Sequence, residues 1–201
     1  KVYAVNKSSR EVIGNAQMEF YDLQSHQIRK IDKKITIYPN HPQEIFDLNN
    51  IKMNGELFLR LADQNGIISK GEYWIPADSD TYDWKKGNWY TTPITHFASY
   101  QTLLSLPPSK LKVSSSIYNG EISLRIHNPN KNLVLFIELV LFNAKGSPVS
   151  YAKWSDNYFT LYPGETRNLT CTYPKKSIPT FIKVRPWNSK PQTIMLHKEK
   201  W

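Results

Sequence analysis

The sequence predicts an all-β protein built from two immunoglobulin-like antiparallel β-sandwiches in tandem, joined by an aromatic-rich linker. Short runs of Val, Ile, Phe and Tyr, separated by Gly, Pro and Asn, recur about every eight to twelve residues, which is the strand spacing of a sandwich. Helical periodicity is nearly absent. The 201 residues leave room for two units of about 100 residues, the usual size of an immunoglobulin-like sandwich.

The first set of predicted strands lies within residues 1–77. Turn signals separate the strands: "YPNHP" at 38–42, "NG" at 54–55 and "DQNG" at 63–66, where glycine is available for positive φ. The predicted strands are residues 1–6, 12–22, 30–38, 43–47, 56–62 and 67–75. We expect these strands to form the first sandwich.

The second set follows "LPP" at 106–108. Alternation is clear in "EISLRIH", where Ile122, Leu124 and Ile126 share one face of a strand. The predicted strands are residues 110–116, 121–127, 134–142, 149–154, 158–161, 166–173 and 180–187. Residues 108–201 are therefore expected to form a second sandwich that ends in a C-terminal tail from Trp187 onwards.

Residues 78–107 form the predicted linker. It opens with "DSDTYDWKKGNWYTTP", which holds three aspartates, two tryptophans and two tyrosines. A connection of this length is long for a structureless segment in a compact protein, and aromatic side chains remove large areas from water when they pack. We therefore expect Trp84 and Trp89 to be mostly covered by protein, and Asp78 and Asp80 to stay in water.

The charge of the chain does not favour a nucleic-acid partner. The formal net charge is +9, but lysines far outnumber arginines and are scattered, whereas nucleic-acid sites prefer arginine in a concentrated patch. The densest basic cluster, "RKIDKK" at 29–34, includes Ile31 and Asp32 and is typical of a solvated strand face. A basic surface of this kind can still assist docking to an acidic partner.

A membrane span is not predicted either. The longest apolar run, "LVLFIELVLF" at 133–142, contains Glu138 and falls well short of the roughly 18 to 20 residues that cross a bilayer. The chain opens on Lys1 without a signal peptide, which indicates a piece of a longer protein. We expect a periplasmic or secreted bacterial location.

Cys171 is the only cysteine of the chain, so an intrachain disulfide is excluded. It alternates with Leu169 and Tyr173 in "NLTCTY", which indicates a small buried residue on the inner face of a strand. A catalytic thiol would need a histidine partner. The pattern favours a structural role.

Metal and cofactor motifs are not found in the sequence. None of the five histidines lies at a zinc-ligand spacing from another. Asp78, Asp80 and Asp83 resemble the start of a calcium loop, but Tyr82 stands where the third acid belongs and Trp89 where the closing acid belongs. The sequence also lacks a phosphate loop, a dinucleotide fingerprint and a nucleophile elbow, so we predict no metal and no cofactor.

Glycoside chemistry needs two carboxylates about 5 to 10 Å apart across the scissile bond. Asp80 with Asp83, or Asp156 with Glu165, are candidate pairs, but no pattern in the sequence singles out either pair. We therefore assign no catalytic residue to the chain.

Two stretches resemble a known family. Residues 72–111 read "EYWIPADSDTYDWKKGNWYTTPITHFASYQTLLSLPPSKL", and residues 151–170 read "YAKWSDNYFTLYPGETRNLT". Together they resemble the carboxy-terminal region of glycoside hydrolase family 2 enzymes, in the exo-β-D-glucosaminidase and β-mannosidase branch. The resemblance rests on "YW" at 73–74, "YDW" at 82–84, "WY" at 89–90, "LPP" at 106–108 and "WSDNYF" at 154–159.

The resemblance implies a larger parent enzyme, a retaining exo-β-glycosidase of oligosaccharides. Such an enzyme has N-terminal sandwiches, a catalytic (β/α)₈ barrel that carries two glutamates at the ends of its strands, and two final sandwiches, which this chain resembles. It implies that the chain is a non-catalytic accessory region, inactive alone, whose partners are the barrel and the N-terminal domains.

An alternative is a stand-alone carbohydrate-binding or adhesion module. In that case Trp84, Trp89 and Tyr90 would form a stacking platform, which requires exposed and coplanar rings. Trp154 and Asp156 complete the set of candidate contacts with another domain or a sugar. For these two residues a structural role is the simpler expectation, with Trp154 packing at the second sandwich and Asp156 shaping its turn.

Overall fold

The computed structural model describes residues 1–49 and 54–196. Its contacts divide the chain into two compact units, Lys1–Leu103 and Leu104–Trp201. We call them the first unit and the second unit, and describe each by itself. Both are built from antiparallel strands, which confirms the all-β immunoglobulin-like class.

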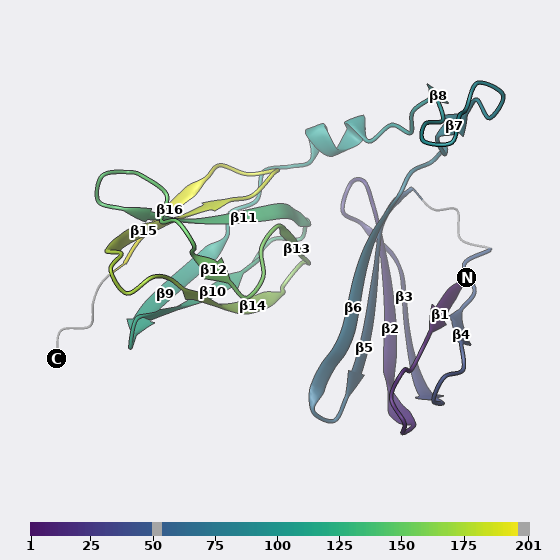
Figure 1. Cartoon of the computed structure of the whole chain (residues 1–201), viewed down its shortest axis with the longest axis horizontal. Helices are drawn as coiled ribbons and strands as arrows, with labels where there is room; N and C mark the ends of the chain where they lie inside the picture. The colour runs from purple at the N-terminus through teal and green to yellow at the C-terminus, as the bar shows by residue number, and fades with distance from the viewer. Residues whose placement is uncertain (50–53, 197–201) are drawn as a thin grey trace. The chain divides into compact units, whose positions relative to one another are not determined.

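The first unit pairs a four-stranded sheet with a two-stranded one (Figure 1). The larger sheet has the order β3-β2-β5-β6, and the smaller sheet joins β1 to β4. The strands are β1 (Val2–Ala4), β2 (Val12–Asp22), β3 (Gln27–Ile37), β4 (Gln43–Phe46), β5 (Gly55–Asp63) and β6 (Gly66–Ile75). All six predicted strands are confirmed, with end positions that differ by a few residues.

The core of the first unit lies under the smaller sheet. Its buried side chains come from β2, β3, β4 and the beginning of β5. They are Ala16, Met18, Phe20, Ile35, Ile37, Phe46 and Leu57. Farther along the same face of β5, Leu59 and Leu61 are half-buried, so burial declines towards the end of that strand.

The basic cluster at 29–34 lies on β3 and is exposed except at Ile31, which is half-buried. The side chains of residues 29–34 therefore contribute little to the core. The expected solvated strand face is therefore confirmed.

The predicted linker contains regular structure. Two short strands, β7 (Thr81–Tyr82) and β8 (Ile94–His96), form a hairpin, and a 3₁₀ helix, η1 (Gln101–Ser105), follows it. Over the residues that the structure describes, no helix is long and apolar enough to cross a membrane.

The second unit has two four-stranded sheets, in the orders β12-β14-β10-β9 and β13-β11-β15-β16 (Figure 1). The strands are β9 (Lys112–Tyr118), β10 (Glu121–His127), β11 (Val134–Asn143), β12 (Lys153–Trp154), β13 (Phe159–Leu161), β14 (Thr166–Thr172), β15 (Pro179–Arg185) and β16 (Gln192–Met195). Fourteen buried side chains form its core among the described residues.

The β9–β10 hairpin shows how the sequence sets this fold. Asn119 and Gly120 have φ values of 49° and 78°, which a tight hairpin turn requires and which Asn and Gly adopt most easily. The turn fixes the register at Tyr118 opposite Glu121. That register directs Ile122, Leu124 and Ile126 into the core, which confirms the predicted face.

The stretch from Trp187 is not simply a tail. Residues Gln192–Met195 form β16, which pairs with β15 at the edge of the second sheet. Ile194 packs against the core of the unit. The sequence hid this strand because it is short and follows Pro191 directly. Residues 197–201 lie outside the described part of the chain.

Candidate functional site

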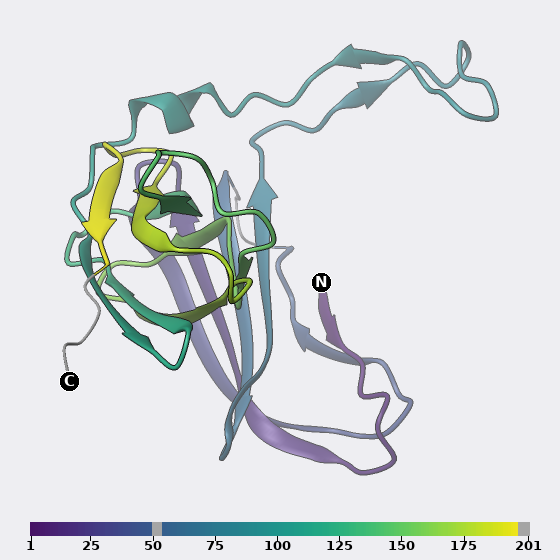
Figure 2. The same cartoon turned by 60° about the vertical axis from the view of Figure 1, so that its left-hand side comes forward.

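Figure 2 shows the backbone of the β7–β8 hairpin and of the loop between its strands. This hairpin holds four aromatic residues of the linker, namely Tyr82, Trp84, Trp89 and Tyr90. Side chains hold the loop between its strands. Asp83 Oδ1 accepts the backbone N–H groups of Lys85 and Lys86 at 3.1 and 3.2 Å, and Asn88 Oδ1 accepts those of Tyr90 and Thr91 at 3.1 and 3.0 Å. These are the local bonds that Asx turns use, so the loop owes its shape to Asp and Asn rather than to ring packing.

The rings themselves are exposed. Trp84 is 76%, Trp89 92% and Tyr90 67% exposed. The prediction that Trp84 and Trp89 are mostly covered by protein is therefore wrong for this chain. The hairpin strands are two and three residues long and bury no large side chain, so the rings have no apolar layer on which to pack. Exposed clusters of large apolar side chains mark interaction sites.

The geometry of the rings does not make a flat platform. The rings of Trp89 and Tyr90 are 4.9 Å apart at an angle of 78°, and those of Tyr82 and Trp84 are 5.5 Å apart at 38°. Sugar stacking requires a face that is free and coplanar with its neighbours. The rings are therefore exposed, as a carbohydrate-binding module requires, but they are not coplanar, which such a module also requires.

The aspartates of the linker brace the hairpin. Asp78 Oδ2 lies 2.8 Å from His96 Nε2, and Asp80 Oδ1 accepts the N–H of Ala98 at 2.7 Å. Asp78 is exposed, as predicted, whereas Asp80 is half-buried. With Asp83 holding the loop, Asp80 and Asp83 are engaged in local structure and do not form a catalytic pair.

Asp156 and Glu165, the other candidate pair, share one guanidinium. Arg167 donates to Asp156 Oδ2 at 3.2 Å and to Glu165 Oε1 at 2.9 Å, and it lies over the ring of Phe159. Glu165 also accepts the N–H of Tyr162 at 3.0 Å. The carboxylate of Glu165 thus closes the turn before β14. Both carboxylates are therefore engaged in local structure, through the shared guanidinium and the backbone of the turn.

Trp154 and Asp156 have the structural roles expected of them. Trp154 lies opposite Cys171 in the β12–β14 pair and packs against the core of the second unit. Asp156 accepts the N–H of Asn157, whose side chain in turn accepts the N–H of Leu139 and donates to its carbonyl. These bonds tie the loop before β13 to β11.

Cys171 is fully buried on β14. Burial raises the pKa of its thiol to about 11, so the reactive thiolate is disfavoured. Among residues 1–49 and 54–196, no three or more His, Cys, Asp or Glu side chains form a group that could hold a metal ion.

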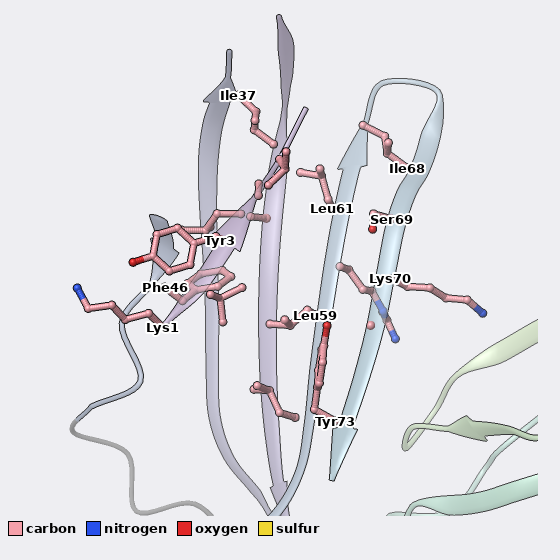
Figure 3. Close-up of a pocket in the computed structure, with 18 of the residues that line it drawn as sticks. Lys1, Tyr3, Ile37, Phe46, Leu59, Leu61, Ile68, Ser69, Lys70 and Tyr73 are labelled. Atoms are coloured by element: carbon pink, nitrogen blue, oxygen red, sulfur yellow. The ribbon is translucent and has the colours of Figure 1, made fainter. Parts of the chain in front are cut away.

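A groove in the first unit was not foreseen from the sequence. It has a volume of about 650 Å³ and lies between β1 and β6 over the inner face of β5. We call it the β1–β6 groove. Figure 3 shows Leu59 and Leu61 along its floor, Tyr3 on the β1 side and Tyr73 on the β6 side. Its residues look like ordinary strand residues in the sequence, and only the unequal widths of the two sheets reveal it.

Comparison with known proteins places the chain in a family. The sequence profile of the exo-beta-D-glucosaminidase Ig-fold domain matches residues 89–189, which is half of the chain. The chain belongs to the exo-β-D-glucosaminidase Ig-fold domain family. The matched region of this Ig-fold domain begins at Trp89 in the hairpin and covers the second unit as far as Ser189. The resemblance drawn from the sequence is confirmed.

Curated relatives include exo-β-D-glucosaminidases of fungi and bacteria. The chain is 30% identical to that of Arthroderma benhamiae over 87% of its own length and 20% of the relative's. For the enzyme of Streptomyces avermitilis the figures are 31% identity, 68% of this chain and 16% of the relative. The chain thus spans about a fifth of these relatives, and the β-mannosidase alternative receives no support from them.

A solved structure has the same fold. The exo-chitosanase CsxA of Amycolatopsis orientalis superposes with a TM-score of 0.78 over 96% of this chain and 25% of its own, at 22% identity. At that identity the likeness speaks for the fold alone. It supports the assignment of both units to immunoglobulin-like sandwiches.

Proposed function

We propose that the chain is a non-catalytic accessory region of a longer exo-β-glycosidase of glucosaminidase type, and that it packs beside the catalytic barrel of that enzyme. The observation that carries the proposal is the family match of a chain that spans about a fifth of the glucosaminidases it resembles. The acids of the chain agree with it, because the two candidate carboxylate pairs are engaged in turns and in the Arg167 contact.

The exposed hairpin supplies the contact surface in this proposal. Tryptophan and tyrosine are enriched where one protein surface anchors in another, and Trp84, Trp89 and Tyr90 present their rings to solvent in this chain. In the parent enzyme these rings bury against a neighbouring domain. The predicted role of Trp84 and Trp89 as interdomain packing is then fulfilled by a partner outside residues 1–201.

An activity assay tests the accessory role. The purified 201-residue chain is incubated with p-nitrophenyl β-D-glucosaminide and with chitosan oligosaccharides, next to the parent-length enzyme. We expect turnover by the parent and none by the chain. Glucosaminide hydrolysis by the chain itself would overturn the proposal.

A second assay tests the hairpin as an anchor. In the parent-length enzyme, Trp84→Ala with Trp89→Ala should lower the melting temperature by several degrees and increase the binding of a hydrophobic dye. Tyr118→Ala removes a ring that is also exposed but lies in the second unit, and serves as the control. If the double tryptophan variant and the Tyr118→Ala variant have equal effects, the hairpin is not a specific anchor.

A carbohydrate-binding module remains the second candidate, because the rings of the hairpin are exposed. Titration of the chain with chitosan and mannan fragments distinguishes the two. If the chain is an accessory region, its tryptophan fluorescence should not change during the titration. A saturable change that Trp89→Ala abolishes would favour the binding module.

A further inference from the structure

Among the described residues of the first unit, no second layer covers the larger sheet at the β1–β6 groove. Leu57 on β5 is buried, but Leu59 and Leu61 on the same face are half-buried. Tyr73 of β6, which is paired with Leu57, is 53% exposed. A sheet normally buries one whole face against another layer, so half of this face lacks its cover.

One wall of the groove is an open strand edge. β1 pairs with β4 on one side, with Val2 opposite Phe46 and Ala4 opposite Gln43, and within the described residues the sheet ends at β1 on the other side. The edge of a strand presents unpaired N–H and C=O groups that accept a further strand. All residues from Lys1 to Lys7 line the groove, so this edge runs along it.

Few charged side chains face the groove. Arg60 and Lys70 lie opposite each other in the β5–β6 pair and alternate with Leu59 and Leu61, so their side chains lie on the other face of the sheet. Lys1 forms an ion pair with Glu44 at 2.8 Å. The rest of the lining is mainly Val, Leu, Ile and Ala. An occupant that suits this lining has apolar side chains towards β5.

We infer that the groove takes up one extended strand from the part of the parent polypeptide that lies outside these 201 residues. The strand adds to the free edge of β1 and covers Leu59, Leu61 and Tyr73, which turns the two-stranded sheet into a three-stranded one. The inference rests on the proposed function, since it needs a longer chain. About four fifths of the length of the Arthroderma benhamiae relative lies outside the matched region and can supply such a strand.

Other occupants suit the groove less well. A sugar would place hydroxyl groups against Leu59, Leu61 and their apolar neighbours without hydrogen-bond partners, which is costly. A second copy of the chain carries the same net charge of +9, and like charges oppose such an interface. A strand satisfies both the backbone edge and the apolar floor, as in other cases of strand addition.

Hydrogen–deuterium exchange tests the inference. The exchange of the backbone amides of residues 2–6 is compared between the 201-residue chain and the parent-length enzyme. We expect exchange in the parent to be slower by about tenfold or more, because added strand pairing protects these amides. Equal exchange in the two proteins would overturn the inference.

Two substitutions sharpen the test. Tyr73→Lys adds a cation on the β6 side of the groove, and Ile13→Lys adds one at an exposed position on the opposite face of the same sheet. Both positions are exposed in the 201-residue chain, so its melting temperature should change little with either. In the parent, Tyr73→Lys should restore fast exchange at residues 2–6, and Ile13→Lys should not.

The remaining outcomes identify other occupants. Slow exchange in a monomeric 201-residue chain would mean that the chain covers its own groove. Slow exchange in a dimer, measured by light scattering, would mean a second copy, and slowing by chitosan oligosaccharides would mean a sugar; each result overturns the inference. If the parent-length enzyme hydrolyses glucosaminide but the β1 amides exchange fast in it, the inference about the groove is wrong and the proposed function stands. If the parent-length enzyme has no glucosaminidase activity, the proposed function is wrong.

Discussion

The two sandwiches of this chain differ in completeness. The second unit sets four strands against four and buries fourteen core side chains among the described residues, whereas the first sets four against two and buries seven. Since burial of apolar area is the main source of stability, the second unit is the self-sufficient one. The first unit has the features of a fold that is completed by contacts outside it.

The largest expected effect comes from the closed core. Leu124 is 1% exposed on β10, and Leu124→Ala should cost about 4 kcal/mol because it leaves a cavity in a packed interior. Leu59→Ala, in the groove of the first unit, should cost only about 1 kcal/mol, because its side chain already faces the open space. Calorimetry on both variants of the 201-residue chain measures the difference. Similar costs would show that the groove is closed in solution.

The second expected effect concerns the contact of Arg167 with Asp156 and Glu165 in the second unit. Arg167→Met should destabilise the second unit by about 2 kcal/mol, because Asp156 and Glu165 lose the guanidinium that they share in a half-buried setting. Arg125→Met on the exposed face of β10 is the matched control and should stay within about 0.5 kcal/mol. Urea unfolding followed by far-UV circular dichroism measures both.

The third expected effect concerns the pH dependence of the stability of the second unit. Burial raises the pKa of Cys171 from its ordinary value of 9.0 to about 11. As pH rises past 9.0 the thiol ionises first in the unfolded chain, so the stability that this group contributes is complete below that pH and is lost up to about pH 11. Between pH 8 and pH 10.5 the loss amounts to about 2 kcal/mol.

Unfolding of the wild type and of Cys171→Ala at pH 8 and pH 10.5 measures this loss. The burial of Tyr173 raises its pKa as well and acts in the same direction, but it is present in both proteins. The stability difference between the two proteins should therefore shift between the two pH values. A constant difference would mean that the thiol is less buried than the structure shows.

The smallest effect is expected from the hairpin, which belongs to neither core. Trp89→Ala in the 201-residue chain should change stability by about 0.5 kcal/mol or less, because its ring is 92% exposed. Thermal unfolding of this chain measures it. A cost well above that value would indicate that the ring packs on one of the units in solution.

Much of the fold could be predicted because local signals and long-range packing agree. The bounds of β2 and β10 match the prediction, since alternation and turn residues mark both ends. β7, β8 and β16 were missed, because strands of two to four residues are too short to show a period and depend on pairing with a distant neighbour.

The site was harder to predict because exposure depends on what lies above a residue. Trp84 and Trp89 have the same apolar rings whether they are buried or exposed. The sequence alone therefore does not show whether another part of the protein covers them. The contact of Arg167 with Asp156 and Glu165 joins β14 to the loop between β12 and β13 and to the turn before β14. Opposite charges at such spacings are common in sequences, so they do not single out this contact. The β1–β6 groove exists because one sheet of the first unit has four strands and the other has two. The pattern of strands along the sequence does not show how many strands each sheet contains.

The position of Cys171 has a consequence for handling the protein. The chain has one thiol, and in the folded second unit it is inaccessible. A disulfide-linked dimer on a non-reducing gel can therefore form only from molecules whose second unit has opened. The fraction of such dimers in a stored sample is a cumulative record of how often that sandwich has unfolded, independent of the state of the first unit.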